Sequence, residues 1–414
     1  MATVAPPAPD VKTSSPPADL TLTGHKGVSS DADLSLGPGA FPGFRRPFRS
    51  LWWLFRVLTG LAFLIPLLAL FAALPGLNVL SLGLLIDAEA RVGRTGRFRD
   101  GFPLLPLSTR IGTIGIMVLL YLAPIMLLSS LAGSQDVIRE ISGLEPGRLR
   151  MITTTLQVVV FVHLMLAIAN GGGFWRFLRP ISNIRRLRRD WRSGKFVDSV
   201  NAWSARILDL FQPIQHFRTA LYAAGGAICW LVIPTLLLGA SSTRPHQNPA
   251  GAAILSLLGG VLMIPVAAWL PLLQCHQAAT GRFLAIFEVR QAREIIARVP
   301  LRWAIATILL YGLAVPLYLS KIVVPPADAF WLFTPLFIIV IYPTRLLMGW
   351  VYGTGQQAGS RSNPLICWPT RLFMIPMLGL YSLILFVVPL ISEAGPRAMF
   401  ENHAFLLPAP GLMK

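Results

Sequence analysis

The sequence predicts an all-α fold: a polytopic transmembrane helix bundle with about eight spans, one short half-span and amphipathic helices at the cytoplasmic interface. Three observations predict it. Hydrophobic residues make up 54% of the 414 residues and charged residues only 13%, and the mean hydropathy is +0.63. Long apolar segments recur along the chain, and arginines gather in every second connection between them. Because soluble proteins carry about 25% charged residues, this composition excludes a soluble enzyme, a secreted disulfide scaffold and a disordered chain.

Seven regular apolar segments reach the roughly 17–25 residues that a spanning helix needs. They cover about 111–133, 151–170, 219–240, 251–274, 302–324, 329–350 and 371–391. An eighth run, 52–86, is broken at Pro75-Gly76, so that 52–74 is expected to span while 77–86 is too short to cross alone. The segment 77–86 is either the second arm of a tight hairpin or an interfacial helix, and we favour the hairpin.

The two ends of the chain are predicted to lie outside the helical domain of 45–391. Residues 1–44 are rich in Pro, Ser, Ala, Gly and Asp, and they cannot bury enough surface to offset chain entropy, so they are expected to be disordered. The first long apolar run begins only at Leu51, which favours a membrane span over a cleaved leader. Residues 392–414 are expected to form a C-terminal tail.

The distribution of positive charge predicts the orientation in the membrane. The net charge is +18, from 36 Lys and Arg against 18 Asp and Glu. Arginines concentrate in 88–110, 172–218 and 275–302, whereas 134–150 is balanced and 241–250 is nearly uncharged. Basic residues collect in short cytoplasmic loops, so the three arginine-rich connections are expected inside and the C-terminus outside. The location of the N-terminus stays open, because its arginines lie inside only if 77–86 returns the chain.

The connection 172–218 contains the most distinctive pattern. Apolar residues recur at spacings of four and three, as on one face of a helix: Phe196, Val200, Trp203, Ile207, Leu210, Ile214 and Phe217. Candidate contact residues within the connection are Arg185, Arg186, Arg188, Arg189, Trp191, Arg192 and Trp203.

Two interpretations of this connection stay open. Its apolar face enters the headgroup boundary while the cations meet anionic lipid, or the face packs on the protein's own spans and the arginines only fix the topology. Membrane lipids, including anionic ones, are therefore the expected partners, and protein partners are left open. Nucleic acid is not expected, because no recognised binding fold surrounds the arginines.

Ionisable groups inside a membrane are functional candidates because they are costly to bury. No Asp or Glu lies within any predicted full span, which argues against proton- or sodium-coupled transport. His163 is the central titratable residue of its span, and a neutral, hydrogen-bonded histidine is favoured over a proton relay or a metal ligand. Arg345 is expected to snorkel toward the interface. No catalytic, phosphate-binding or metal-binding motif is found, so we expect no enzyme activity, no cofactor and no metal.

A short repetition suggests an internal repeat near 77–133 and 262–324. Thr95-Gly96-Arg97-Phe98 recurs 185 residues later as Thr280-Gly281-Arg282-Phe283, and each is followed by a span that contains Leu-Leu-Tyr. Because transporter folds often arise from such repeats, a repeat-derived transporter or channel for an unidentified solute is the alternative function.

Several stretches carry a family resemblance. They are 78–85 (NVLSLGLL), 89–102 (EARVGRTGRFRDGF), 316–322 (PLYLSKI), 343–347 (PTRLL) and 401–408 (ENHAFLLP). In these stretches the chain resembles a family of uncharacterised bacterial multi-pass membrane proteins, the domain of unknown function numbered 4013. The resemblance implies a polytopic protein of the bacterial inner membrane and supplies no substrate, cofactor or catalytic residue. The leading prediction is a non-enzymatic multi-pass membrane protein whose arginine-rich interfacial face contacts anionic lipid or partners.

Overall fold

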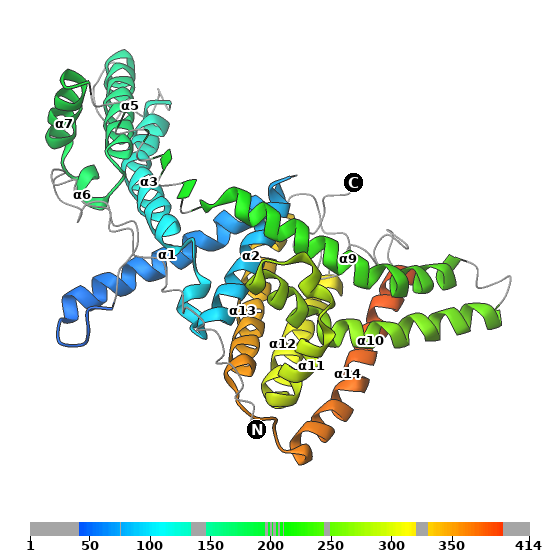
Figure 1. Cartoon of the computed structure of the whole chain (residues 1–414). Coiled ribbons are helices and arrows are strands. Elements are labelled where there is room, and N and C mark those ends of the chain that lie inside the picture. The colour runs from blue at the N-terminus through cyan, green and yellow to red at the C-terminus, as the bar shows by residue number, and fades with distance from the viewer. Residues whose placement is uncertain are drawn as a thin grey trace, which may run out of the picture. The chain divides into compact units, whose positions relative to one another are not determined.

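The computed structural model describes residues 41–74, 76–133, 146–194, 211–243, 249–319 and 330–391, together with a few isolated residues between 195 and 210 (Figure 1). Within these ranges the chain forms helices and no strand. Eight of the described helices are long and apolar enough to cross a membrane. The predicted fold class, an all-α bundle of about eight spans, is therefore confirmed.

The eight long helices match the predicted apolar segments in order. They are α1 (Pro47–Ala73), α3 (Leu105–Gly133), α5 (Pro146–Ala169), α9 (Pro213–Thr243), α10 (Pro249–Thr280), α12 (Pro300–Leu319), α13 (Phe330–Gln357) and α14 (Pro364–Ile391). Six of them begin at a proline, whose fixed φ and missing N–H suit the first position of a helix. Each extends beyond the apolar segment that predicted it at one end or at both, because polar residues continue the helical turn past the membrane core.

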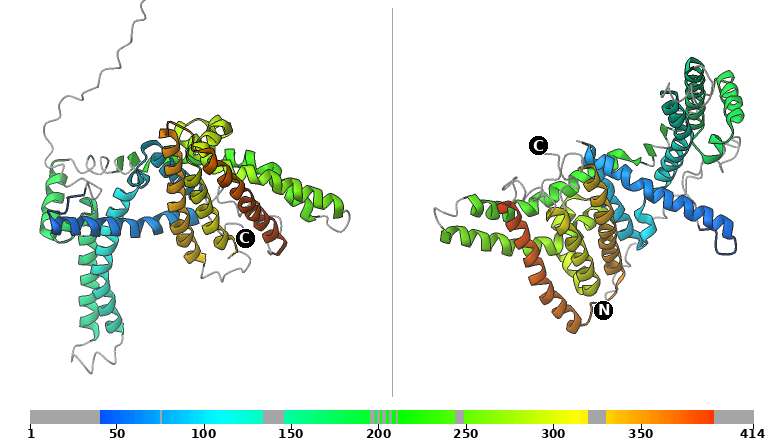
Figure 2. Two further views of the ribbon diagram at one scale, coloured as in Figure 1. Left: turned by 90° about the horizontal axis from the view of Figure 1, so that it is seen from below. Right: turned by 180° about the vertical axis from the view of Figure 1, so that it is seen from behind.

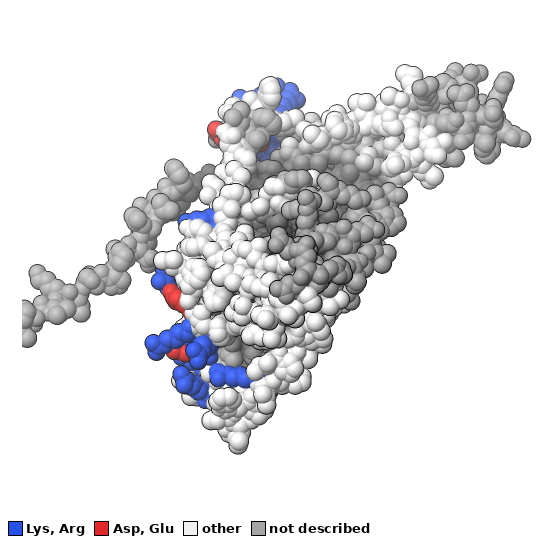
Figure 3. Space-filling model, turned by 90° about the vertical axis from the view of Figure 1, so that its right-hand side faces the viewer, with Lys and Arg blue, Asp and Glu red and all other residues white. Residues whose placement is uncertain are grey.

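The outer surface of the bundle is apolar, as a lipid environment requires. Large aliphatic and aromatic side chains are exposed along the long helices, among them Leu119, Phe161 and Leu257. On the face shown in Figure 3, the charged residues of the described part gather along one edge and at the top, and the white surface between them carries none. A soluble protein could not present such a surface to water, so the chain is an integral membrane protein.

Helix α2 (Leu77–Thr95) lies at the centre of the bundle and packs against α1, α9, α10 and α13 (Figures 1 and 2). Most of its residues are buried, which excludes an interfacial helix and favours the hairpin with α1. The predicted half-span 77–86 was too short, because the helix continues through charged residues to a left-handed Gly96 with φ +70°. Those charges are tolerated because protein, not lipid, surrounds them.

Three clusters of buried apolar residues hold the helices together, one of them a small cluster between α2 and α9. The largest one joins α1 and α2 to α9–α14. The third one lies between α3, α5 and the short helix α6 (Phe174–Phe177), and consists of Met117, Leu164, Ala167 and Phe177. Helix α7 (Pro180–Arg192) follows α6 and packs on α5. Two short 3₁₀ helices, η2 (Phe98–Gly101) and η3 (Phe283–Phe287), follow α2 and α10, and α11 (Val289–Arg298) precedes α12.

The ends of α2, α10, α11 and α13 meet at one end of the bundle. Arg94 donates hydrogen bonds to the carbonyl oxygens of Ala278 and Ala279 at 3.3 and 3.4 Å, and Arg298 donates to that of Gly355 at 3.2 Å. We call this end, formed by 91–99 and 282–302, the arginine-rich end. It contains Arg91, Arg94, Arg97, Arg99, Arg282, Arg290, Arg293, Arg298 and Arg302.

Three predicted features lie outside the described residues: the N-terminal tail up to residue 40, the C-terminal tail 392–414, and most of the periodic stripe. Ile214 and Phe217, the last two residues of that stripe, are exposed in the first turns of α9.

Candidate functional site

A buried ion pair links the central helix α2 to α13. Arg345 of α13 donates from Nη1 to Oε2 of Glu89 at 3.2 Å and to Oε1 of Gln274 at 2.9 Å. All three side chains are buried almost completely. Glu89 and Gln274 each lie six residues before the last residue of their helix, about 9 Å along the axis, so the pair lies inside the bundle and away from the helix ends.

The packing around Glu89 leaves one of its oxygens without a partner. Among the described residues no hydrogen-bond partner reaches Oε1 of Glu89. A Cβ added to Gly349 would collide with the backbone oxygen of Glu89, and one added to Gly353 would lie 2.7 Å from that of Gly93. Small residues four apart allow helix backbones in membranes to approach closely. Gly349 and Gly353 therefore bring α13 against α2 and place Arg345 beside the carboxylate.

One expectation from the sequence was wrong here. Arg345 does not snorkel, because its guanidinium finds a carboxylate and an amide oxygen inside the bundle. The absence of acidic residues from the full spans did not mean that the membrane-embedded region lacks them, since α2 carries Asp87 and Glu89 into the interior. The signals that could have revealed this are the Asp87/Arg91 pair four residues apart and the Arg94–Gly96 helix ending, which together predict a helix as far as Thr95.

Asp87 organises a second polar cluster, which links α2 to α9. Its Oδ2 lies 2.7 Å from Nε of Arg91 and 3.8 Å from Nδ1 of His216 on α9, and its Oδ1 lies 3.9 Å from Nη2 of Arg94. His216 is fully buried, and neither ring nitrogen has a hydrogen-bond partner among the described residues. The surroundings of α2 thus change from apolar to ionic over its last two and a half turns, from Asp87 to Thr95.

The residues that bind Arg345 occupy matching positions in the two halves of the chain. Glu89 and Gln274 each lie six residues before the threonine of a Thr-Gly-Arg-Phe sequence. In both places the glycine is left-handed, with φ +70° at Gly96 and +69° at Gly281, and a 3₁₀ helix follows. Arg345 thus holds α2 and α10 together at equivalent sites of the two sequences.

A third network ties α10 to α13 at the arginine-rich end. His276 contacts the hydroxyl of Tyr352 through Nδ1 at 2.8 Å and Oε2 of Glu288 through Nε2 at 2.7 Å. Arg282 donates to Oε1 of Glu288 at 2.7 Å. The hydrogen bond from His276, and then the positive charges of His276 and Arg282, lower the pKa of the Glu288 carboxyl. Glu288 therefore stays ionised and fixes η3 to the end of α10.

Helix α7 carries six of the seven predicted contact residues: Arg185, Arg186, Arg188, Arg189, Trp191 and Arg192. Although α7 packs on α5, three of its apolar side chains are largely exposed: Ile181 at 65%, Ile184 at 55% and Trp191 at 72%. Among these arginines one acidic contact is described, between Nε of Arg186 and Oδ2 of Asp190 at 3.7 Å. The seventh candidate, Trp203, lies outside the described residues.

His163 and Tyr121 bind α6, the short helix that precedes α7. His163 donates from Nε2 to the carbonyl oxygen of Phe177 at 2.8 Å, because a carbonyl can only accept, and the hydroxyl of Tyr121 donates to the same oxygen at 2.7 Å. The Phe177 ring is fully buried between α3 and α5. His163 thus serves as an anchor for α6, in keeping with a hydrogen-bonded histidine.

Comparisons with known proteins add no assignment. No family model matches the chain, and neither a curated protein nor a solved structure is significantly similar to it. The resemblance to the domain of unknown function 4013 therefore stays a prediction. No group of histidines, cysteines and acidic residues suited to a metal ion occurs within the described ranges.

Proposed function

We propose that this membrane protein is non-enzymatic and that its arginine-rich helix α7 binds anionic lipid at the cytoplasmic surface of the membrane. The observation that carries the proposal is α7, on which an apolar stripe and a set of arginines are exposed side by side. Such a helix lowers its free energy by placing the stripe at the headgroup boundary while the guanidinium groups meet lipid phosphates. The positive-inside rule supports a cytoplasmic location.

The expected strength follows from the charges. Each basic residue near an anionic membrane contributes about 1 kcal/mol, so Arg185, Arg186, Arg188 and Arg189 together supply about 4 kcal/mol, or roughly a thousandfold in affinity. The exposed Ile181, Ile184 and Trp191 add hydrophobic burial that does not depend on lipid charge. Binding is therefore expected to prefer anionic lipid and to weaken with salt.

Hydrogen exchange of the full-length protein in nanodiscs tests this function. Amides of 174–194 should exchange more slowly when part of the lipid is phosphatidylglycerol than when all of it is phosphatidylcholine. The variant R185Q/R186Q/R188Q/R189Q should lose that difference. A matched control removes the same charge from exposed positions elsewhere, R97Q/R99Q/R290Q/R293Q, and should retain it. Equal exchange of 174–194 in both lipids with the wild-type protein would refute lipid binding by α7.

A second function, transport of protons or of a small solute through a repeat-derived bundle, is favoured by the Glu89–Arg345 pair. Parallel repeats place ion and substrate sites at their interface. Here the Glu89 carboxylate lies between matching helices, and its Oε1 has no hydrogen-bond partner among the described residues. His163 does not support a proton relay through its span, because its ring is engaged with the Phe177 carbonyl. Proteoliposomes loaded with a pH dye and energised with valinomycin test proton movement: wild-type flux that Glu89→Gln abolishes would support transport, and flux no greater than in empty liposomes would reject proton transport.

A further inference from the structure

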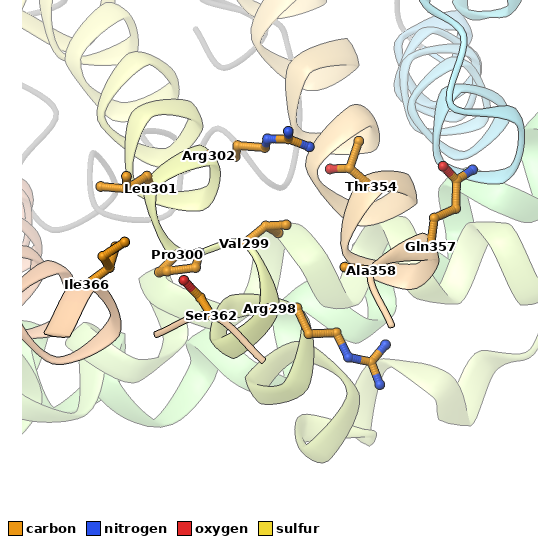
Figure 4. A pocket seen from close by; sticks show the side chains of 10 residues that line it. All are labelled: Arg298, Val299, Pro300, Leu301, Arg302, Thr354, Gln357, Ala358, Ser362 and Ile366. Carbon is orange, nitrogen blue, oxygen red and sulfur yellow. The ribbon is translucent and has the colours of Figure 1, made fainter. Parts of the chain in front are cut away.

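A cavity of about 470 Å³ lies where the end of α11 and the start of α12 face the end of α13 and the start of α14 (Figure 4). Its volume falls within the roughly 300–1,000 Å³ of ligand pockets. Two arginines, Arg298 and Arg302, line it together with the polar side chains of Thr354, Gln357 and Ser362 and several apolar ones. It is distant in sequence from α7 and shares no residue with it.

Arg302 is arranged to receive an anion. Its guanidinium carbon lies 4.9 Å from the centroid of the Trp350 ring, and Figure 4 shows the side chain projecting from α12 toward α13. A guanidinium stacked on an aromatic face keeps its N–H edge available for hydrogen bonds. Within the described residues no carboxylate forms an ion pair with Arg302.

The charges around the cavity leave a net positive field. Arg298 donates to the Gly355 carbonyl and lies 3.6 Å from Oε2 of Glu294, whose Oε1 also binds Arg290 at 3.0 Å. One carboxylate is thus shared by two arginines, while no carboxylate of the described ranges pairs with Arg302. The positive end of the α12 dipole adds to the field, since α12 begins at Pro300 on the cavity wall.

Exposed apolar side chains line the cavity and lie beside it. Leu301 and Ile366 line it and are exposed, and Leu365 and Trp368 beside them are more exposed still. These residues begin the spanning helices α12 and α14, where acyl chains meet headgroups. A ligand that fits both parts has a phosphate for Arg302 and hydrocarbon for Leu301 and Leu365.

We propose that this cavity binds the phosphate headgroup of an anionic phospholipid, with Arg302 as its principal cation. The site deepens the proposed lipid-binding function but does not depend on α7. A free phosphate compound offers Arg302 the same charged group. A lipid differs from it because its acyl chains also gain affinity from the apolar side chains Leu301 and Leu365.

Native mass spectrometry of the full-length protein, released from detergent with added phosphatidylglycerol, tests the site. The measurement is made in the R185Q/R186Q/R188Q/R189Q background, so that lipid bound by α7 does not contribute. We expect this background to retain bound phosphatidylglycerol and Arg302→Gln to weaken that retention about tenfold, the effect of one lost charged hydrogen bond. Arg290→Gln, on a side chain 92% exposed and outside the cavity, should leave it unchanged.

Further arms separate the outcomes. Ser362→Asp places a carboxylate in the cavity without removing Arg302, and it should also weaken retention, which covers the case in which Arg302→Gln does not fold. Glycerol 3-phosphate, the headgroup chemistry without acyl chains, should compete poorly, and competition as strong as that of the lipid would overturn the lipid assignment. No retention in the α7 background, or retention unaffected by both cavity variants, would overturn the site. Neither result would affect slower amide exchange of α7 in anionic nanodiscs.

Discussion

Removing either partner of the Glu89–Arg345 pair should destabilise the bundle more than removing both. Glu89→Met leaves a buried guanidinium without its carboxylate, and Arg345→Met leaves a buried carboxylate without its guanidinium. Breaking a buried pair in this way costs about 3–5 kcal/mol, whereas replacing both partners by apolar residues of similar volume is often nearly neutral. The two side chains are almost completely buried, and Nη1 of Arg345 lies 3.2 Å from Oε2 of Glu89. The double variant E89M/R345M should therefore be more stable than either single variant.

The assay measures the free energy of unfolding in mixed micelles by titrating the protein with a denaturing detergent. The exposed pair Arg290–Glu294 serves as the control, since its nitrogen and oxygen lie 3.0 Å apart but the arginine is 92% exposed. The corresponding cycle with R290M and E294M should give a coupling of about 0.5 kcal/mol or less. Additive costs for Glu89 and Arg345, with no coupling between them, would refute the view that this pair closes the core.

Three further perturbations test other parts of the structure. Gly349→Ala should cost about 1–3 kcal/mol of unfolding free energy through overpacking against α2, whereas Gly312→Ala, where an added Cβ meets nothing within 4 Å, should be neutral or stabilising; equal effects would contradict the close approach of α13. His163→Ala should speed amide exchange in α6 and α7, and unchanged exchange would show that the Phe177 carbonyl is not its anchor. Because the pKa of Glu288 is lowered by His276, its contribution is present above the unfolded carboxyl pKa and is lost as pH falls through the lower folded value, so Glu288→Gln should flatten the acid limb of the melting-temperature profile.

The positions of the spans could be predicted from sequence because lipid imposes a simple rule. Every spanning helix must present about 20 apolar residues, and α3, α9 and α14 are visible as such runs. The exception is α2, where the rule fails for a physical reason. The C-terminal half of this helix is surrounded by α9, α10 and α13, so its charged residues are paired inside protein and interrupt the apolar run.

The candidate site was predictable only in part. The arginines of α7 stand out by composition, and the exposure of Ile181 and Ile184 agrees with an amphipathic surface helix. The Glu89–Arg345 contact joins residues 256 positions apart, and no local pattern in one sequence reports such a distance. The Thr-Gly-Arg-Phe repetition was the available clue, because it aligns Glu89 with Gln274 before either contact is known.

The central claim is that the long helices cross a membrane with α7 and the arginine-rich end on its cytoplasmic side. Single cysteines at Ser182 on α7, Ser360 after α13 and Ala250 at the opposite end of α10, in a background with Cys229, Cys275 and Cys367 replaced by alanine, report it through a membrane-impermeant maleimide. Positions 182 and 360 should react only after the cells are permeabilised, whereas position 250 should react in intact cells. Labelling of 182 or 360 from outside intact cells would contradict the claim.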